Sequence, residues 1–396
     1  MQNWFSKRNI ATFFLILMCT QYELIEGIGN EVSYLKFGMM CLSPCILLVT
    51  SPKISKAVYW GILYIFLAFF SAFLHYKTFR LSTVGYLISF IMTFIMYYNL
   101  VYCEKAFTVN YFFKVIKYLI IAYTICLVLQ QIAIIVGIHK LYIINLIRFL
   151  DRGIGSQSLS LESSHSATIF TFLFLAFLRI LELKWGKEYV TIPLIYKQEK
   201  WVLIGFIWSM LTMGSSTAIV GLGILSLYFI KRRIVIIALP ILLAFYITIP
   251  YIDFKPLQRA KKTLDATLTL DSKKVISADG SAAARIVPLL NTLTGLNLTK
   301  AETWVGKGVD TANKTKYLSK NQMLVGIVDY GLICYIVALT FIYVCCFTHF
   351  LSLETLIFFL MFSCEIRNIY FLWGGFMVFT TIKYFQSTSI SLCSLK

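Results

Sequence analysis

Residues 57–74 read A-V-Y-W-G-I-L-Y-I-F-L-A-F-F-S-A-F-L, an apolar stretch without a single charged residue. With a helical rise of about 1.5 Å per residue, about 20 residues cross the hydrocarbon core of a bilayer. Similar runs recur along the chain, and only 14% of its 396 residues are charged, whereas a soluble domain has about 25%. Because backbone exposed to lipid must satisfy its own hydrogen bonds, the sequence predicts an all-α polytopic membrane protein.

Along the rest of the chain, on both sides of this stretch, the hydrophobic pattern predicts further helices, about twelve transmembrane helices in all. They form a first membrane part, residues 1–250, and a last one, residues 321–396, on either side of a long polar loop, residues 251–320. Three of the spans are too short to cross upright, so we expect them to be tilted, to end early or to be buried among their neighbours. The predicted spans are 9–28, 33–50, 57–75, 81–102, 112–137, 166–183, 201–213, 217–230, 234–250, 321–346, 351–363 and 368–386.

Basic residues in the short loops predict the orientation, because cytoplasmic loops of membrane proteins are enriched in Lys and Arg. These loops all fall on one side of the predicted bundle, so both termini are expected in the cytoplasm. The long loop then lies on the outer, periplasmic side, which its charge permits because long loops translocate largely regardless of charge. The residues that decide the orientation are Lys7, Arg8, Lys53, Lys56, Lys105, Lys114, Lys117, Arg179, Lys184, Lys187, Lys197, Lys200, Lys231, Arg232 and Arg233.

The formal net charge of +18 does not indicate a nucleic-acid partner, because topology accounts for most of it. The remaining excess lies in residues 251–320, which hold twelve Lys and Arg against six Asp and Glu. The lipid bilayer and its anionic head groups are the expected partners of this loop. The ten cysteines form no disulfide or metal-binding pattern, so no metal and no cofactor is expected.

Two outer loops are long enough to build a site. The shorter, residues 138–165, ends in D-R-G-I-G-S-Q-S-L-S-L-E-S-S-H, whose Gly and Ser predict irregular backbone. In the longer loop, Leu257, Leu264 and Leu268 follow helical spacing and predict a short amphipathic helix with its basic residues in water. Residues 281–293 predict a second helix, which bends at Pro288.

Arg152 and Arg285 each lie in one of these two loops. Two guanidinium groups that converge from different loops would clamp a diphosphate, and their charge does not titrate. The glycines at 153 and 155 would let the backbone approach a ligand closely. The alternative is that both arginines are simply solvated or set the topology.

Glu162 and His165 lie at the mouth of the sixth predicted span, three residues apart. A carboxylate and an imidazole at this spacing share one face of a helix, and either could act as a general base toward a sugar hydroxyl. The alternative is helix capping, in which Glu162 complements the helix dipole and nearby serines cap the helix.

Two further polar motifs interrupt the apolar pattern. M-G-S-S-T-A, residues 213–218, is either a turn between two helices or a polar patch on the wall of a cavity. G-K-G, residues 306–308, resembles a phosphate-binding turn only in part, because the spacing of a Walker A motif is missing.

Together, four motifs resemble those of bacterial O-antigen and capsular polysaccharide polymerases, the Wzy type of the O-antigen ligase and polymerase superfamily. The order and rough spacing match over residues 150–335, although the distance from arginine to glycine in the long loop differs from the usual form of the family. They are Arg152 followed by E-S-S-H-S-A (162–167), G-S-S-T-A-I-V-G-L-G (214–223), Arg285 followed by G-K-G (306–308), and Asn321 followed by D-Y-G-L (329–332). The chain departs from the family at Ser163, where a proline is usual, and at Ser216, where an arginine is usual.

The resemblance implies a GT-C-like helical bundle with one large periplasmic loop in the bacterial inner membrane. It also implies a metal-independent inverting glycosyltransferase whose donor and acceptor are undecaprenyl-pyrophosphate-linked glycans, with a chain-length regulator and a flippase as partners. Arg152 and Arg285 would then bind the pyrophosphate, and Glu162, or else His165, would be the base.

Two alternatives remain open at the level of the sequence. An O-antigen ligase of the same superfamily would transfer the glycan to a different acceptor. A flippase for lipid-linked oligosaccharides also has about twelve spans, but that class is expected to show internal repeats and short loops. The chain shows no repeat between its halves and has a long loop.

Overall fold

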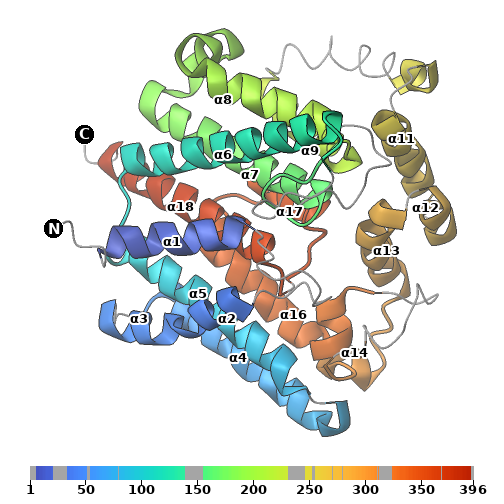
Figure 1. Ribbon diagram of the computed structural model, residues 1–396. Coiled ribbons are helices and arrows are strands. Elements are labelled where there is room, and N and C mark those ends of the chain that lie inside the picture. The colour runs from blue at the N-terminus through green and yellow to red at the C-terminus, as the bar shows by residue number, and fades with distance from the viewer. Residues whose placement is uncertain are drawn as a thin grey trace. The chain divides into compact units, whose positions relative to one another are not determined.

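The computed structural model describes residues 6–20, 34–50, 54–78, 80–138, 155–230, 246–251, 255–269, 271–278, 280–309, 311, 323–366 and 368–393. Over these residues the chain is all-helical and has no strand, as predicted (Figure 1). It divides into two compact units, which are described separately below.

The first unit combines residues from the start, the middle and the end of the chain: 1–111, 285–350 and 362–396. In Figure 1, α4 lies alongside α5 and α16. Its elements are α1 (Lys7–Cys19), α2 (Tyr34–Cys41), α3 (Ser43–Thr50), α4 (Lys56–Leu74), η1 (Tyr76–Thr78), α5 (Leu81–Tyr102), most of α13 (Gly280–Gly295), α14 (Ala301–Val305), α16 (Val325–Cys346) and α18 (Tyr370–Cys393).

The second unit comprises residues 112–284 and 351–361. Its central helix, α7, is almost entirely buried and packs against α8, α9 and α17. Its elements are α6 (Val109–Ile135), α7 (Ser163–Trp185), η3 (Lys187–Tyr189), α8 (Ile192–Thr212), α9 (Ser216–Phe229), η4 (Ile249–Tyr251), α11 (Lys255–Leu268), α12 (Ser272–Ala278) and α17 (Leu353–Leu360).

Five of the described helices, α4, α5, α6, α7 and α16, are long and apolar enough to cross a membrane. This supports a helical membrane protein, while the number of twelve spans stays a prediction. α17 has 8 residues where a span was predicted over 351–363, so its length is about 12 Å. The predicted span 234–250 lies mostly outside the described residues.

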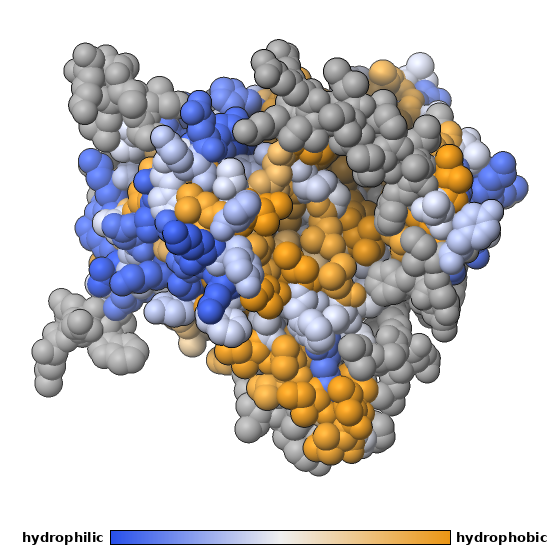
Figure 2. Space-filling model, turned by 90° about the horizontal axis from the view of Figure 1, so that it is seen from above, coloured by the Kyte–Doolittle hydropathy of each residue, from blue (hydrophilic) through white to orange (hydrophobic). Residues whose placement is uncertain are grey.

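Many large hydrophobic side chains are exposed on the surface of the helices. On α4, Phe66 and Phe73 are 64% and 77% exposed. On the face drawn in Figure 2, hydrophobic residues cover broad areas. Such wide apolar surface is typical of contact with lipid rather than with water.

Two lysines from other helices satisfy the C-terminal carbonyl groups of α1 and α16. Lys36 is buried and donates to the carbonyl oxygens of Leu17, at 2.8 Å, and Thr20. Lys383 of α18 donates to those of Val344 and Phe347, at 2.7 and 2.6 Å. The last carbonyl groups of a helix have no partner within it, so these ammonium groups stabilise both ends.

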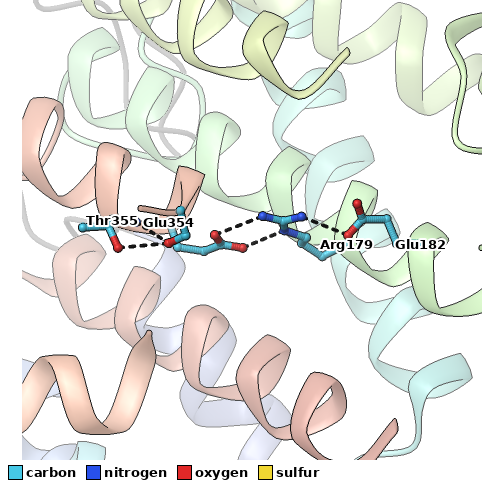
Figure 3. Close-up of polar contacts among 5 residues, drawn as sticks. Arg179, Glu182, Glu354 and Thr355 are labelled. Carbon is cyan, nitrogen blue, oxygen red and sulfur yellow. Dashed lines mark hydrogen bonds and ion pairs between the residues drawn. The ribbon is translucent and has the colours of Figure 1, made fainter. Parts of the chain in front are cut away.

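A charged network joins α7 to α17 in the second unit (Figure 3). The guanidinium group of Arg179 donates to both carboxylate oxygens of Glu354, at 2.7 and 3.2 Å, and to Glu182 at 3.0 Å. Ser352 caps α17 by accepting the N–H of Thr355. The side chains of Arg179 and Glu354 are only 16% and 7% exposed, so each charge depends on its partner.

We expect Glu354→Leu to lower the free energy of unfolding by about 3–5 kcal/mol, because it leaves the Arg179 charge buried with one carboxylate instead of two. Chemical unfolding of the purified protein in detergent measures this change. The matched control is Glu104→Leu, which breaks the exposed ion pair with Lys7 and should cost about 1 kcal/mol or less. Equal losses in the two variants would contradict a structural role for the Arg179 network.

Candidate functional site

The helices that follow the first and second motifs, α7 and α9, run parallel and side by side. A Cβ atom added at Gly221 of α9 would lie 2.1 Å from Oγ1 of Thr171 in α7. Farther along both helices, the guanidinium carbon of Arg179 lies 5.9 Å from the ring centroid of Tyr228. From the first contact to the second, the chain advances by eight residues in α7 and by seven in α9, so the two helices run in the same direction.

Residues 156–162, which precede α7, form a largely buried loop that is fastened to Gln130 of α6. The side-chain amide of Gln130 donates to the carbonyl of Ser158 at 3.0 Å and accepts its N–H at 2.7 Å. The hydroxyl of Ser158 donates to the carbonyl of Tyr123. Ser158 has a φ of 55°, an unfavourable conformation that these bonds hold. The loop therefore leads into α7 along one fixed path.

Glu162 and His165, the two predicted catalytic residues, lie together at the start of α7. Glu162 is the N-cap residue, but its side chain makes no capping hydrogen bond. Its carboxylate accepts the hydroxyl of Ser164 at 3.2 Å and lies 4.0 Å from Nε2 of His165. The side chains of Glu162 and His165 are 40% and 21% exposed, so neither is fully buried.

The second motif forms the turn between α8 and α9. Gly214 has a φ of 71°, Ser215 is the N-cap residue, and α9 begins at Ser216. Because α7 and α9 run parallel, this hydroxyl-rich turn lies level with the start of α7. Just before it, Thr212 accepts a hydrogen bond from Gln131 at 2.7 Å.

The third and fourth motifs meet in the first unit, where α16 is interrupted at Gly331. A Cβ atom at Gly331 would lie 2.3 Å from the carbonyl oxygen of Trp304, and one at Gly306 would lie 2.5 Å from that of Asp329. The N–H groups of Lys307 and Gly308 donate to the carbonyls of Val328, at 2.8 Å, and Asp329, at 3.3 Å. These N–H groups are therefore engaged with α16, which disfavours a phosphate-binding role for G-K-G.

The proposed arginine clamp stays a prediction. Arg152 lies outside the described residues, and so does Asn321 of the fourth motif. Arg285 lies within α13, two helical turns before Thr292. Oγ1 of Thr292 accepts the N–H of Leu324 at 3.0 Å and so ties α13 to the start of α16.

Sequence reasoning missed Gln130 and Gln131, which position both motifs of the second unit. The signal was present, because two adjacent amides in an apolar span are costly unless they are hydrogen-bonded. Among the described residues, no group of three or more His, Cys, Asp or Glu side chains could hold a metal ion.

Comparison of the chain with models of protein families, with characterised proteins and with solved structures finds no match.

We expect Gly331→Ala to be strongly destabilising, because the residue has a φ of 87° and its new methyl group would collide with the backbone at Trp304. The backbone strain alone costs about 1–3 kcal/mol. Thermal unfolding of the purified protein measures the effect. Gly85→Ala is the matched control, since a Cβ there meets nothing within 4 Å. An unchanged melting temperature for Gly331→Ala would show that the loop and the helix are not locked together at this point.

Proposed function

We propose that the chain is a membrane glycosyltransferase that polymerises lipid-linked oligosaccharide units at the periplasmic face of the bacterial inner membrane. The observation that supports this most directly is the partly exposed Glu162–His165 pair, with the carboxylate 4.0 Å from Nε2. It stands at the start of α7, level with the hydroxyl-rich turn of the second motif. The contact between Gly306 and Gly331 likewise joins the third and fourth motifs.

In the proposed reaction, a hydroxyl group of the acceptor glycan attacks the anomeric carbon of the donor glycan on the face opposite its pyrophosphate. A new glycosidic C–O bond forms, the bond from the sugar to the pyrophosphate breaks, and undecaprenyl pyrophosphate leaves with the electron pair. Glu162 takes the proton of the attacking hydroxyl, with His165 as the second candidate. Arg152 and Arg285 would stabilise the leaving pyrophosphate, whose negative charge increases as the bond breaks. The polymer therefore lengthens by one unit each time.

A strain that lacks this chain distinguishes the proposed function from its alternatives. Loss of a polymerase leaves surface lipid that carries a single repeat unit. Loss of a ligase leaves no attached glycan and accumulates polymer on the lipid carrier, and loss of a flippase leaves neither product. The purified chain should also convert synthetic lipid-linked repeat units into a ladder of longer products. Accumulation of lipid-linked polymer in the deletion strain would overturn the proposal in favour of the ligase.

A further inference from the structure

The amphipathic helix α11 (Lys255–Leu268) is held close to the end of a predicted membrane span. The predicted span 234–250 ends within the single turn η4 (Ile249–Tyr251), and α11 begins four residues after Tyr251. The ammonium group of Lys261 lies 4.6 Å from the ring centroid of Tyr246, whose hydroxyl donates to Asp265. Since Tyr246 belongs to the predicted span, α11 is tied to the place where the chain leaves the bilayer.

Two leucines on α11 are exposed, although they lie in a polar loop. Leu257 is buried, but Leu264 and Leu268 are 48% and 72% exposed. They are four residues apart and so lie on one face of the helix. In the sequence, the three leucines form one apolar stripe, but only Leu257 is packed into the protein. Leu264 and Leu268 can therefore contact apolar groups outside the protein, such as those of lipids.

The charge around this apolar stripe is positive. Residues 255–278 hold six Lys and Arg against two Asp. α11 packs beside α12 (Ser272–Ala278), as Figure 1 shows. The side chains of Lys262, Lys273 and Lys274 are exposed. A helix with exposed leucines on one face and lysines around it matches the surface of an anionic bilayer.

We propose that α11 lies in the outer surface of the membrane. Leu264 and Leu268 enter the boundary between head groups and acyl chains, and Lys273 and Lys274 of α12 bind the phosphates of anionic phospholipids. The helix thereby keeps the loop 251–320 on the membrane surface, where lipid-linked molecules arrive by lateral diffusion. This binding does not depend on glycosyl transfer, so it can be tested separately from the proposed function.

The first experiment uses the full chain in lipid nanodiscs and an impermeant maleimide. Cysteine replaces Leu264, Leu268, Lys262 or Lys273, and labelling of the native cysteines in the unsubstituted protein is subtracted. We expect Leu264→Cys and Leu268→Cys to react about tenfold more slowly than the two lysine positions. The reason is that a thiol in the apolar part of the bilayer is shielded from a maleimide that stays in water. Equal rates at all four positions would overturn the proposal. Slow labelling in native membranes together with fast labelling in nanodiscs would assign the face to a protein partner instead.

The second experiment tests the anionic head groups. An environment-sensitive fluorophore on Leu264→Cys should shift to shorter wavelength when phosphatidylglycerol is added to phosphatidylcholine nanodiscs. Replacement of Lys273 and Lys274 by Gln should abolish this shift, and replacement by Arg should preserve it, since only the charge is required. A spectrum that ignores phosphatidylglycerol, or a shift that survives the Gln replacements, would exclude these lysines as the binding groups.

Discussion

Glu162→Gln should lower the rate of polymer formation by about 10²–10⁴-fold, the usual contribution of a general base. The amide has nearly the size of the carboxylate and can still accept the hydrogen bond of Ser164, but it cannot take the proton of the acceptor hydroxyl. The initial rate of ladder formation from lipid-linked repeat units, measured with purified protein in nanodiscs, tests this expectation.

The matched control is Glu188→Gln, an exposed glutamate in η3 on the predicted cytoplasmic side, which should leave the rate unchanged. A normal rate in Glu162→Gln together with a large loss in His165→Gln would assign the base to His165. Normal rates in both variants would show that neither residue of the pair takes the proton.

Arg152→Ala and Arg285→Ala should each abolish long-chain polymer while the protein still inserts into the membrane. Removal of one group that stabilises a developing negative charge costs about 10²–10³-fold in rate. Lysine should rescue poorly, because a point charge lacks the planar fork of a guanidinium group. Gel ladders and membrane fractions of each variant provide the measurement.

Arg80→Ala serves as the control for the arginine variants, since Arg80 precedes α5 on the predicted outer side and lies in none of the four motifs. It should leave the chain length unchanged. Wild-type ladders in both Arg152→Ala and Arg285→Ala would exclude the clamp, even if the variant of Glu162 is inactive.

The helices were the most predictable part of the fold, because charged residues on either side of an apolar run indicate where the helix begins and ends. The predicted span 81–102 coincides with α5, which follows Arg80 and ends shortly before Glu104. The predicted span 351–363 is longer than α17, because the chain turns after Leu360 and Ser363 has a φ of 56°. Hydropathy does not report backbone angles, so this turn was not visible in the sequence.

The candidate site was predictable only where its parts are close in sequence. Glu162 and His165 share one helical turn, so their spacing already indicated that they meet. Gly306 and Gly331 are separated by part of the long loop and the start of α16, and no local pattern links them. The same limit applies to Gln130, whose partner Ser158 is 28 residues away.

The lysine partners of α1 and α16 also impose an order on the synthesis of the protein. Lys36 leaves the ribosome 16 residues after Thr20, whose carbonyl group it satisfies, so the end of α1 is completed early. Lys383 follows Val344 by 39 residues and lies in the last described helix. Until the ribosome has delivered α18, the end of α16 must keep its carbonyl groups in contact with water or head groups. The polar contacts at this end of α16 are therefore completed only with the last part of the chain.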